Sequence, residues 1–491
     1  MGIVKFSVTL LIVMALLMPN LTASGFENSG IGTQAMGMAG AFRAIADDWT
    51  AAYYNPAGYA FIKDNQLGAN MAFFQLRNEI NPDYRFGNTF ETGIFNNHTD
   101  YNKNEILSNP SGGFVVKLPM GGKEIVLGLS AYQPFDNNIS WKLFGLPLAY
   151  NDTLSVPKDQ FTNNLDVVSF QLTASREFIE DKLSLGLGVQ VLRGDLLFTN
   201  INFRNNPYPP PLSVRPWNKI TEWSHNDGNG WGFGLNGGML YKINEKLKFA
   251  ITAQLPFDIT IDGTTKFEFY MPKIPTLIEN TDDPNLQEGT AGYLFASGSK
   301  VVDSADFHTK LKLPPSIALG VAYNITEDFT VSLDAAYTFW SRFDGFYFNY
   351  THHRGLTGAA DSATIARNFF TQNLANPLNW DDAGKIMLGA RYKYQNLFTF
   401  LAGVSDDQSP IHNTSEINPQ FIDTGDKVTV SGGVIWHYQQ WDFGVSTSYT
   451  YYPDFSAPDM VDLNNDGLYD TFKGSYKASR YETVLSFNYR F

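Results

Sequence analysis

The sequence predicts an all-β protein, a 14-stranded antiparallel transmembrane β-barrel plugged by a small N-terminal hatch. Three observations lead to this fold class. Apolar and polar residues alternate with a period of two through most of the chain. Short turns and long polar loops follow one another in strict alternation, which is typical of bacterial outer-membrane barrels. The composition is rich in aromatic residues, at 15%, and poor in charged residues, at 17%.

The composition argues against several other classes of protein. The 491 residues carry a formal charge of -14, which disfavours a nucleic-acid partner. They include no cysteine, so disulfides, thiolate metal ligands and cysteine nucleophiles are all excluded. Mean hydropathy is -0.20, and no apolar stretch after residue 23 approaches the ~18–20 residues of a membrane-spanning helix. A helical membrane protein is therefore not expected.

Residues 1–23 have the features of a secretory signal peptide. Lys5 is the positive start, Phe6 to Met18 form the apolar run, and Leu21-Thr22-Ala23 is a small-residue cleavage site. Cleavage after Gly25 is an alternative, and a single membrane anchor is disfavoured because the run is short. We therefore expect the mature chain to be exported.

The last segment shows the period-two pattern most clearly. Tyr481, Leu485 and Phe487 share one face, whereas Glu482 and Ser486 share the other. Counting such segments predicts fourteen strands, at 66–77, 112–119, 124–140, 163–178, 182–199, 229–243, 247–268, 307–325, 329–345, 384–395, 397–405, 427–438, 441–453 and 478–491.

The connections place all short turns on one rim and all long loops on the other. Short turns are expected at 119–123, 179–181, 244–246, 326–328, 396 and 439–440. Long polar loops are expected near 78–111, 141–162, 200–228, 269–306, 346–383, 406–426 and 454–477. A secreted β-sandwich is the alternative, but its outward faces should be polar, whereas these carry aromatic residues. Closure into a barrel also satisfies the backbone hydrogen bonds that lipid cannot.

Residues 24–65 do not alternate and are mostly small and uncharged. Asn55-Pro56 favours a turn within them. A compact segment of this kind is expected to sit inside the barrel, whereas a periplasmic tail, the alternative, would be charged or of low complexity. The predicted organisation is a signal peptide at 1–23, a hatch at 24–65 and a barrel at 66–491.

Several motifs resemble the FadL/TodX family of outer-membrane transporters over nearly the whole mature chain. The hatch of that family is similar to Gly-Xaa-Gly-Thr-Gln at 30–34, Met38-Ala39-Gly40-Ala41 and Asn55-Pro56-Ala57-Gly58. Weaker matches follow in order along the barrel at 133–135, 313–314 and 337–343. In one departure, the family's Asn-Xaa-Pro-Phe-Gly pattern is replaced here by Tyr132-Gln133-Pro134-Phe135-Asp136.

The resemblance implies passive uptake of hydrophobic molecules, either long-chain fatty acids or aromatic hydrocarbons. It implies a hatch that blocks straight passage and a kink in the third strand that opens the wall sideways. The hatch or gate residues would be Phe26, Asn55, Pro56, Ala57 and Gly58, with the turn at 55–57 lying against the kink. The ligand would first rest between loops 200–228 and 269–306, and then move to an interior site near Phe26.

Pro134 gives independent support for an irregular third strand. Proline cannot donate a ladder hydrogen bond and is disfavoured in central strands, and every strand of a closed barrel is central. The sequence Gln133-Pro134-Phe135 therefore predicts a bulge or lateral opening. The alternative places Pro134 beyond the hydrogen-bonded part of the strand, at its external end.

A carboxylate ligand would favour a cation inside the barrel. The alternation predicts that six basic side chains face inward, and we take Lys312, Lys385, Arg391 and Lys393 as the headgroup candidates; the other two are Lys310 and Arg490. Asp334 and Asp442 are expected to face inward as well and could pair with them.

One loop resembles the start of a calcium-binding loop. Asp462, Asn464, Asp466 and Asp470 place oxygen-bearing side chains at near-alternate positions, but Lys473 stands where an EF-hand has its bidentate Glu. The alternative is a solvated turn. Apart from a structural calcium ion here, no cofactor is expected.

No spacing of histidines, acids and hydroxyls predicts catalysis, so we do not expect an enzyme. The alternative functions are a porin for polar solutes, hatch-plugged or open, and a barrel for surface adhesion. The expected partners are a hydrophobic small molecule, outer-membrane lipid and the barrel-assembly machinery. We expect a monomer in the bacterial outer membrane.

Overall fold

The computed structural model describes residues 25–28, 30–83, 100–101, 106–120, 123–143, 154–277, 283–360, 364–411 and 413–491. The predicted signal peptide, residues 1–23, lies outside these described residues. Within the described parts of the chain, no helix is long and apolar enough to cross a membrane.

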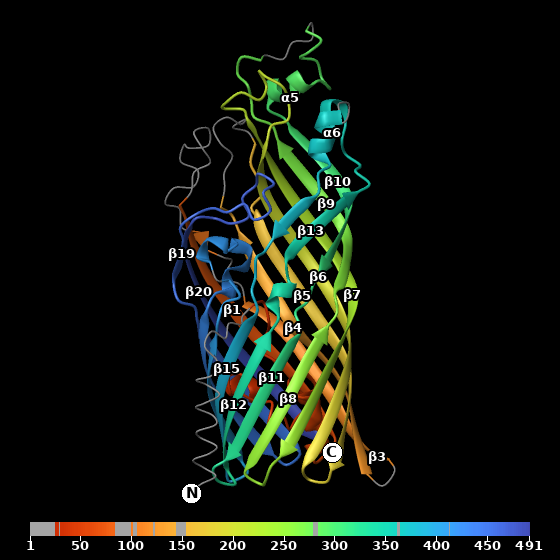
Figure 1. Ribbon diagram of the computed structural model, residues 1–491, viewed down its shortest axis with the longest axis vertical. Coiled ribbons are helices and arrows are strands. Elements are labelled where there is room, and N and C mark those ends of the chain that lie inside the picture. The colour runs from red at the N-terminus through yellow and green to blue at the C-terminus, as the bar shows by residue number, and fades with distance from the viewer. Residues whose placement is uncertain are drawn as a thin grey trace.

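The described strands form one closed antiparallel sheet of fourteen barrel strands, as the sequence predicts (Figure 1). β1 pairs with β20 and closes the ring. Eleven barrel strands are continuous, and three are each broken in two. The continuous strands are β1 (Gln66–Pro82), β3 (Ile106–Met120), β4 (Lys123–Trp141), β5 (Phe161–Ile179), β6 (Leu183–Asn205), β7 (Lys219–Lys242), β15 (Ala383–Tyr394), β16 (Phe398–Asp407), β17 (Lys427–Tyr438), β18 (Trp441–Tyr451) and β20 (Gly474–Arg490).

The three broken strands are neighbours in the wall. They are β8 (Leu247–Pro256) with β9 (Ile259–Tyr270), β10 (Lys300–Leu311) with β11 (Ser316–Asn324), and β12 (Phe329–Thr338) with β13 (Gly345–Thr351). Short strands β2 (Asp100–Tyr101), β14 (Leu374–Pro377) and β19 (Phe455–Ala457) extend the sheet. The loops hold α5 (Ala291–Ser297), α6 (Thr364–Phe370), η2 (Trp340–Arg342), η3 (Gly358–Ala360), η4 (Thr414–Glu416) and η5 (Pro419–Thr424).

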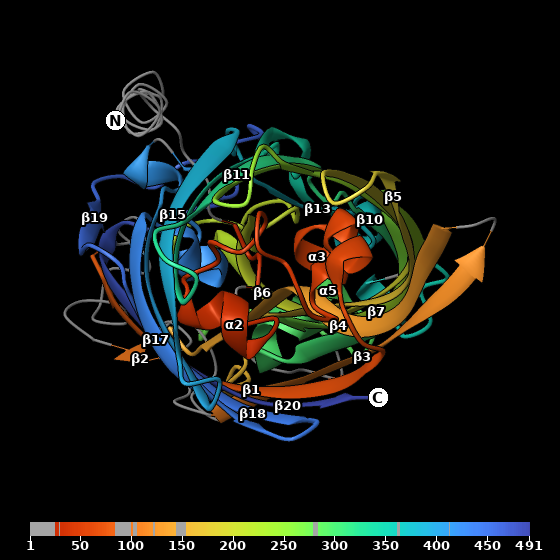
Figure 2. The same cartoon turned by 90° about the horizontal axis from the view of Figure 1, so that it is seen from below.

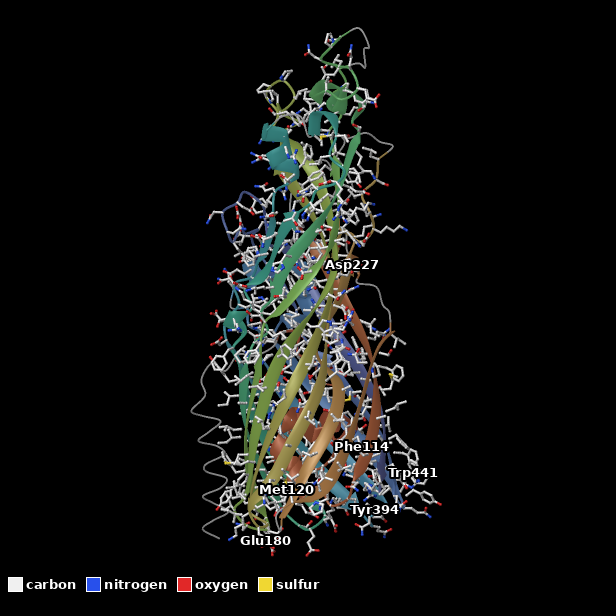
Figure 3. All side chains as sticks on the ribbon, turned by 90° about the vertical axis from the view of Figure 1, so that its right-hand side faces the viewer. Phe114, Met120, Glu180, Asp227, Tyr394 and Trp441 are labelled. Atoms are coloured by element: carbon white, nitrogen blue, oxygen red, sulfur yellow. The ribbon has the colours of Figure 1, made fainter. Side chains whose placement is uncertain are left out.

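The outer face changes from apolar to polar along the wall. On β7, Trp231 and Phe233 are 54% and 61% exposed, while Gly230 and Gly232 between and beside them are buried. The next outward residues toward the external loops are Asn229 and Asp227. Asp227 lies far from the end of the barrel that carries the short turns, where Met120, Glu180 and Tyr394 are labelled (Figure 3). This confirms the predicted alternation and sets the outer edge of the lipid-facing belt between Asn229 and Trp231 on this strand.

The segment before β1 lies inside the ring of strands (Figure 2). It contains α2 (Thr33–Gly37), α3 (Ala51–Tyr54) and η1 (Pro56–Phe61), with small or aromatic residues that are almost all buried. Ser446 Oγ donates to the Thr33 carbonyl at 2.8 Å. The buried Asp334 carboxylate accepts from the Arg43 backbone N–H at 2.9 Å. The backbone of the hatch is therefore in direct contact with side chains of the barrel wall.

Glycines in the wall permit this close approach. A Cβ placed on Gly403 of β16 would lie 2.2 Å from the Met38 carbonyl carbon, and one on Gly186 of β6 would lie 2.3 Å from the Pro56 carbonyl carbon. No side chain can occupy that space while the hatch backbone is there, because backbone atoms cannot be moved aside as a flexible side chain can.

The wall is interrupted where β10/β11 faces β12/β13. The β10–β13 ladder ends at His308 and Asn349, and the chain between β10 and β11 includes Pro314 and Pro315, which have no N–H to donate. Phe339 N–H donates to the Pro315 carbonyl at 2.9 Å, which extends the β11–β12 ladder by one bond to the edge of the break. η2 follows directly, and this break lets Trp340 turn into the barrel.

We predict that Gly403→Ala displaces the hatch from the barrel wall without unfolding the barrel. The new methyl group meets backbone atoms of Met38 and Ala39, and such overpacking costs about 1–3 kcal/mol. Arg43 should become accessible to trypsin, and a small polar antibiotic should enter cells faster. Gly432→Ala is the matched control, since its Cβ would have its nearest neighbour at 3.5 Å. Equal trypsin resistance in both variants would contradict the packing of the hatch backbone on Gly403.

Candidate transport site

The third barrel strand, β4, is kinked at the predicted position. Its pairing with β5 runs to Tyr132 and Ser169 and resumes at Phe135 and Val167. Gln133 and Pro134 thus lie opposite the single residue Val168, which is the definition of a β-bulge. Pro134 is inside the hydrogen-bonded region, because β4 continues to Trp141, so the alternative of a proline beyond the ladder is wrong.

The kink coincides with the end of the ladder on the other side of β4. β3 and β4 pair from Met120 and Lys123 only as far as Gly112 and Ala131. Beyond that point β3 continues to pair with β1, and β4 continues to pair with β5. Within the described ranges, one edge of β4 after Ala131 therefore has no neighbouring barrel strand.

The N-terminal segment occupies part of that free edge. Asn28 N–H donates to the Pro134 carbonyl at 2.8 Å, and Asp136 N–H donates to the Phe26 carbonyl at 3.0 Å. Glu27 and Phe135 form the bridge between them. Residues 26–28 act as a short extra strand that satisfies backbone groups which the kink would otherwise leave open.

Phe26 is the anchor of this segment. Its ring lies 5.0 Å from those of Trp340 and Phe343 and 5.8 Å from that of Phe135, all edge to face. Trp380 and Phe421 complete the aromatic cluster at 6.1 and 6.3 Å. Burial of one phenylalanine contributes about 1.5–3 kcal/mol, and each of the two hydrogen bonds about 0.5–1.5 kcal/mol. These contacts stabilise the docked segment by a few kcal/mol in total, so the segment can leave β4 and return reversibly.

The turn at Asn55 anchors the hatch to β5 and β6, and not to the kink of β4 as predicted. Asn55 Nδ2 donates to the Arg43 carbonyl at 2.9 Å, and its Oδ1 accepts from Ala57 N–H at 3.1 Å. The Ala57 carbonyl accepts from Ser175 of β5 and Ser184 of β6. The expectation that residues 55–57 lie against the kink is therefore wrong, since residues 26–28 lie there instead.

Pro56 and Gly58 fit the same anchoring role. Pro56 begins η1, where its missing N–H costs nothing. A Cβ on Gly58 would lie 2.1 Å from the Ala46 carbonyl oxygen, so glycine is required where two hatch segments touch. This turn joins the hatch to itself and to β5, β6 and β7.

Three of the four predicted headgroup cations have acidic partners. Lys312 pairs with Asp344 at 2.5 Å and Lys385 with Asp407 at 3.1 Å. Arg391 contacts the hatch through Asp47 at 2.7 Å. Each pair is largely neutralised, which lowers its attraction for a ligand carboxylate.

The other basic side chains divide between the two sides of the wall. Lys393 lines a cavity at the periplasmic side of the hatch, as does Arg490, which pairs with Asp442 at 3.0 Å. Lys310 is exposed, whereas Thr309 and Leu311 beside it are buried. The predicted inward orientation of Lys310 is therefore wrong, because the parity of β10 places the odd-numbered residues inside.

Two cavities lie on opposite sides of the hatch. On the external side, Met36, Arg43 and Tyr54 of the hatch face Lys385 and Lys427 of the wall. On the periplasmic side, a cavity of about 400 Å³ is lined by hatch and wall residues, among them Gln34, Asp47, Arg391, His437 and Asn488. β15 and β17 contribute to both cavities at different heights, and α2 lies between these levels against β16, β17 and β18.

Comparison with known proteins agrees with this geometry. Residues 14–491 match the family described as outer membrane protein transport protein (OMPP1/FadL/TodX). The chain belongs to this family. The FadL/TodX family is one of outer-membrane transport proteins, so this chain is an outer-membrane transport protein with the family's 14-stranded barrel.

Individual relatives of the FadL/TodX family are distant in sequence but similar over most of their length. The chain is 24% identical over 376 residues to a long-chain fatty acid transport protein of Salmonella typhi, covering 73% of this chain and 74% of that one. A Pseudomonas aeruginosa FadL homologue superimposes with a TM-score of 0.69 at 18% identity, over 95% and 100% of the two chains. The toluene transporter TodX of P. putida gives 0.63 at 14% identity, over 94% and 99%.

The sequence predicted Phe26 and Phe135 as site residues and 337–343 as a family match, but it did not indicate that these residues form one aromatic cluster with Trp380 and Phe421. Trp340 and Phe343 lie in a strand break, where period two carries no information about which way a side chain points. Trp380 and Phe421 lie in loops. Their closeness to Phe26 depends on contacts over more than 300 residues of sequence, for which the order of residues gives no signal.

The loop predicted to bind calcium folds on its own backbone. Asp462 accepts from the N–H groups of Asp466 and Gly467, at 3.2 and 2.8 Å. Asn464 accepts from Asp466 N–H at 3.1 Å, and Asp470 accepts from Leu463 N–H at 2.8 Å. Among the described residues, no three His, Cys, Asp or Glu side chains are grouped to hold a metal ion. Calcium binding here stays a prediction.

We predict that this loop opens more readily as pH rises from about 4 to about 7. Burial raises the pKa of Asp470 to about 7, and the charges of Asp466 and Asp462 add to the rise, although the Leu463 N–H opposes it. The folded loop therefore binds a proton that the open loop releases, so its stability decreases with pH across this window. Hydrogen exchange of the Asp470 amide, corrected for intrinsic rate, should show stronger protection at pH 5 than at pH 8.

Asp470→Asn should remove most of that difference, because the neutral amide does not titrate. Asp459→Asn, an exposed position in the same loop, is the control and should retain it. Equal protection at the two pH values in the unmodified protein would show that Asp470 is ionised in the folded loop.

Proposed function

We propose that this protein is a passive channel, and not an enzyme, that takes up long-chain fatty acids or similar lipophilic compounds across the outer membrane. The observation that carries the proposal is the pairing of residues 26–28 with the free edge of β4. A wall that is open on one side of a kinked strand, and covered there by a short segment, has the parts that lateral release requires. The proteins it resembles are described as transporters of long-chain fatty acids or of toluene.

The first step of the proposed route is capture by the external loops. Tyr208 and Phe295 pack edge to face at 5.4 Å, which brings the loop after β6 together with α5. Leu212, Trp217 and Leu294 are partly buried against the same cluster. An apolar molecule resting among them removes apolar surface from water and lies above the interior aromatic cluster.

The second step is movement of the N-terminal segment. Phe26 occupies the centre of the aromatic cluster, and two backbone bonds join the described residues of the segment to β4. A ligand with a long apolar chain buries more surface there than one phenylalanine does, so it can replace the ring with a net gain. Displacement of residues 26–28 then uncovers the edge of β4.

The third step is exit sideways into the membrane. Leu129 on β4 and Phe170 on β5, close below the kink, are 60% and 48% exposed on the outer face. The kink therefore adjoins the lipid-facing belt, and an apolar ligand leaves without crossing water. We keep as predictions that the protein is a monomer and is inserted by the barrel-assembly machinery.

The porin alternative predicts an open polar path. The hatch stands between the two cavities described above, with backbone packed directly on the wall glycines. Single-channel conductance distinguishes the two functions. The proposed channel should show little conductance and retain lipid on mild extraction, whereas measurable sugar permeation without retained lipid would favour the porin. Surface adhesion would instead leave the uptake of palmitate unchanged when the gene is deleted.

We predict that deleting Pro134 abolishes uptake while the barrel still assembles. Removal of one bulge residue restores one-to-one pairing between β4 and β5, which straightens the strand and closes the wall. Uptake of radiolabelled palmitate by cells that express the variant should fall to the level of cells without the protein.

Deletion of Phe178 is a matched control. It removes the extra residue of the register shift near the turn end of β5, between Glu177 and Ile179, far from the kink. That variant should transport at the normal rate. Undiminished uptake after deletion of Pro134 would exclude the lateral route.

A further inference from the structure

We infer that Trp340 and Trp380 form a hydrogen-bonding subsite that receives the uncharged oxygen of an otherwise apolar ligand. The inference rests on the proposed function, since it concerns the ligand that replaces Phe26 in the aromatic cluster. It specifies the ligand class as long-chain molecules that end in a neutral acceptor, such as an alcohol, an ester or a protonated carboxyl group.

The inference rests on two buried indole N–H groups that have no acceptor. Trp340 is 0% and Trp380 4% exposed, and in the described part of the chain neither Nε1 has a hydrogen-bond partner. Two other buried tryptophans do have an acceptor. Trp141 Nε1 donates to the Pro419 carbonyl at 2.8 Å and Trp223 Nε1 to the Asp159 carbonyl at 3.0 Å. Buried donors usually have a partner in folded proteins. Other buried polar atoms of this protein also have none in the described residues, but Trp340 Nε1 and Trp380 Nε1 share one apolar cluster, which points to a common acceptor.

The two donors belong to rings that enclose the same residue. The Trp340 and Trp380 rings lie 5.4 Å apart, and both pack against Phe26, at 5.0 and 6.1 Å. Phe26 has no acceptor to offer them. It is also the side chain that the proposed route displaces. A ligand in its place meets both indoles, and one oxygen with two lone pairs can accept from both.

The surroundings favour a neutral acceptor over a carboxylate. Phe135, Phe343 and Phe421 complete the cluster around Phe26. Both paired segments carry an acidic residue next to their phenylalanine: Glu27 follows Phe26, and Asp136 follows Phe135. Lys312, the headgroup candidate in the adjacent strand break, is already paired with Asp344. The described rings around Phe26 include no cation, so an ionised group held among them would lose its hydration without a counter-ion inside the aromatic cluster.

Three ligands of equal chain length test the inference. Purified protein in detergent is equilibrated with radiolabelled hexadecane, 1-hexadecanol or palmitate at pH 8, and retention is compared with that of protein-free micelles. In the unmodified protein, 1-hexadecanol should bind more tightly than palmitate. In the double variant Trp340→Phe/Trp380→Phe, the affinity for 1-hexadecanol relative to hexadecane should fall about ten-fold, as expected for the loss of two neutral hydrogen bonds.

The double variant Trp231→Phe/Trp436→Phe is the control. It removes two indoles from the exposed outer face, 54% and 42% exposed, and should leave the ratio of the two affinities unchanged. An unchanged ratio in Trp340→Phe/Trp380→Phe overturns the subsite but not the proposed function, as does tighter binding of palmitate than of 1-hexadecanol. Failure of the unmodified protein to bind any of the three overturns the proposed function and the subsite together.

A measurement on the unmodified protein is independent of whether the variants fold. With ¹⁵N-labelled tryptophan, two indole N–H resonances should move downfield when 1-hexadecanol is added and stay in place with hexadecane. No shift on saturation with 1-hexadecanol would overturn the subsite.

Discussion

The need of each backbone N–H and C=O for a partner controls this structure more than any side-chain contact does. Lipid offers no hydrogen bonds, so a strand in the wall can lose its neighbour only where something else takes over the pairing. At the kink of β4 that substitute is the segment at 26–28. At the break between β10/β11 and β12/β13, the prolines remove donors, and Lys312 and Asp344 form an ion pair across it. Both irregularities are tolerated because they are covered, and a cover that is held by few bonds can also be removed.

The same constraint separates the fixed part of the hatch from its movable part. Residues from 30 onward are tied to the wall by many polar bonds, such as those of Ser446, Ser175 and the Asp334 carboxylate, and by glycines that admit backbone contact. In the described residues, the segment at 25–28 has two backbone bonds to β4, a hydrogen bond from Tyr53 Oη to Glu27 at 3.1 Å, and one central ring. We therefore expect ligand to move the N-terminal segment first and to leave the rest of the hatch seated. A small local change is enough to open the wall while the barrel stays blocked to polar solutes.

The alternation of residue types predicted the barrel, the strand number and the lipid-facing residues, because period two is a direct consequence of the pleat. The missing N–H of proline, a local property of the residue, predicted the bulge at Pro134. The alternation failed for Lys310, where the parity assumed across a broken strand is reversed. The family resemblance failed for the turn at Asn55, whose partner strands depend on how the hatch folds inside the ring. The alternation indicated nothing of Trp340 or Trp380, because neither lies in a regular strand.

These failures share a physical cause that also bears on function. At the level of the hatch, glycines, serines and paired charges occupy inward positions of unbroken strands, and these leave little room for a large apolar molecule. Around Phe26, unbroken strands do supply apolar residues, such as Leu165 of β5 and Phe198 of β6. The indole of Trp340 reaches the same centre from the strand break at η2. The ligand chemistry of this barrel therefore lies where the repeating pattern ends. Two buried donors without acceptors beside Phe26 are the strongest sign that this centre is built for a molecule other than the protein's own side chain.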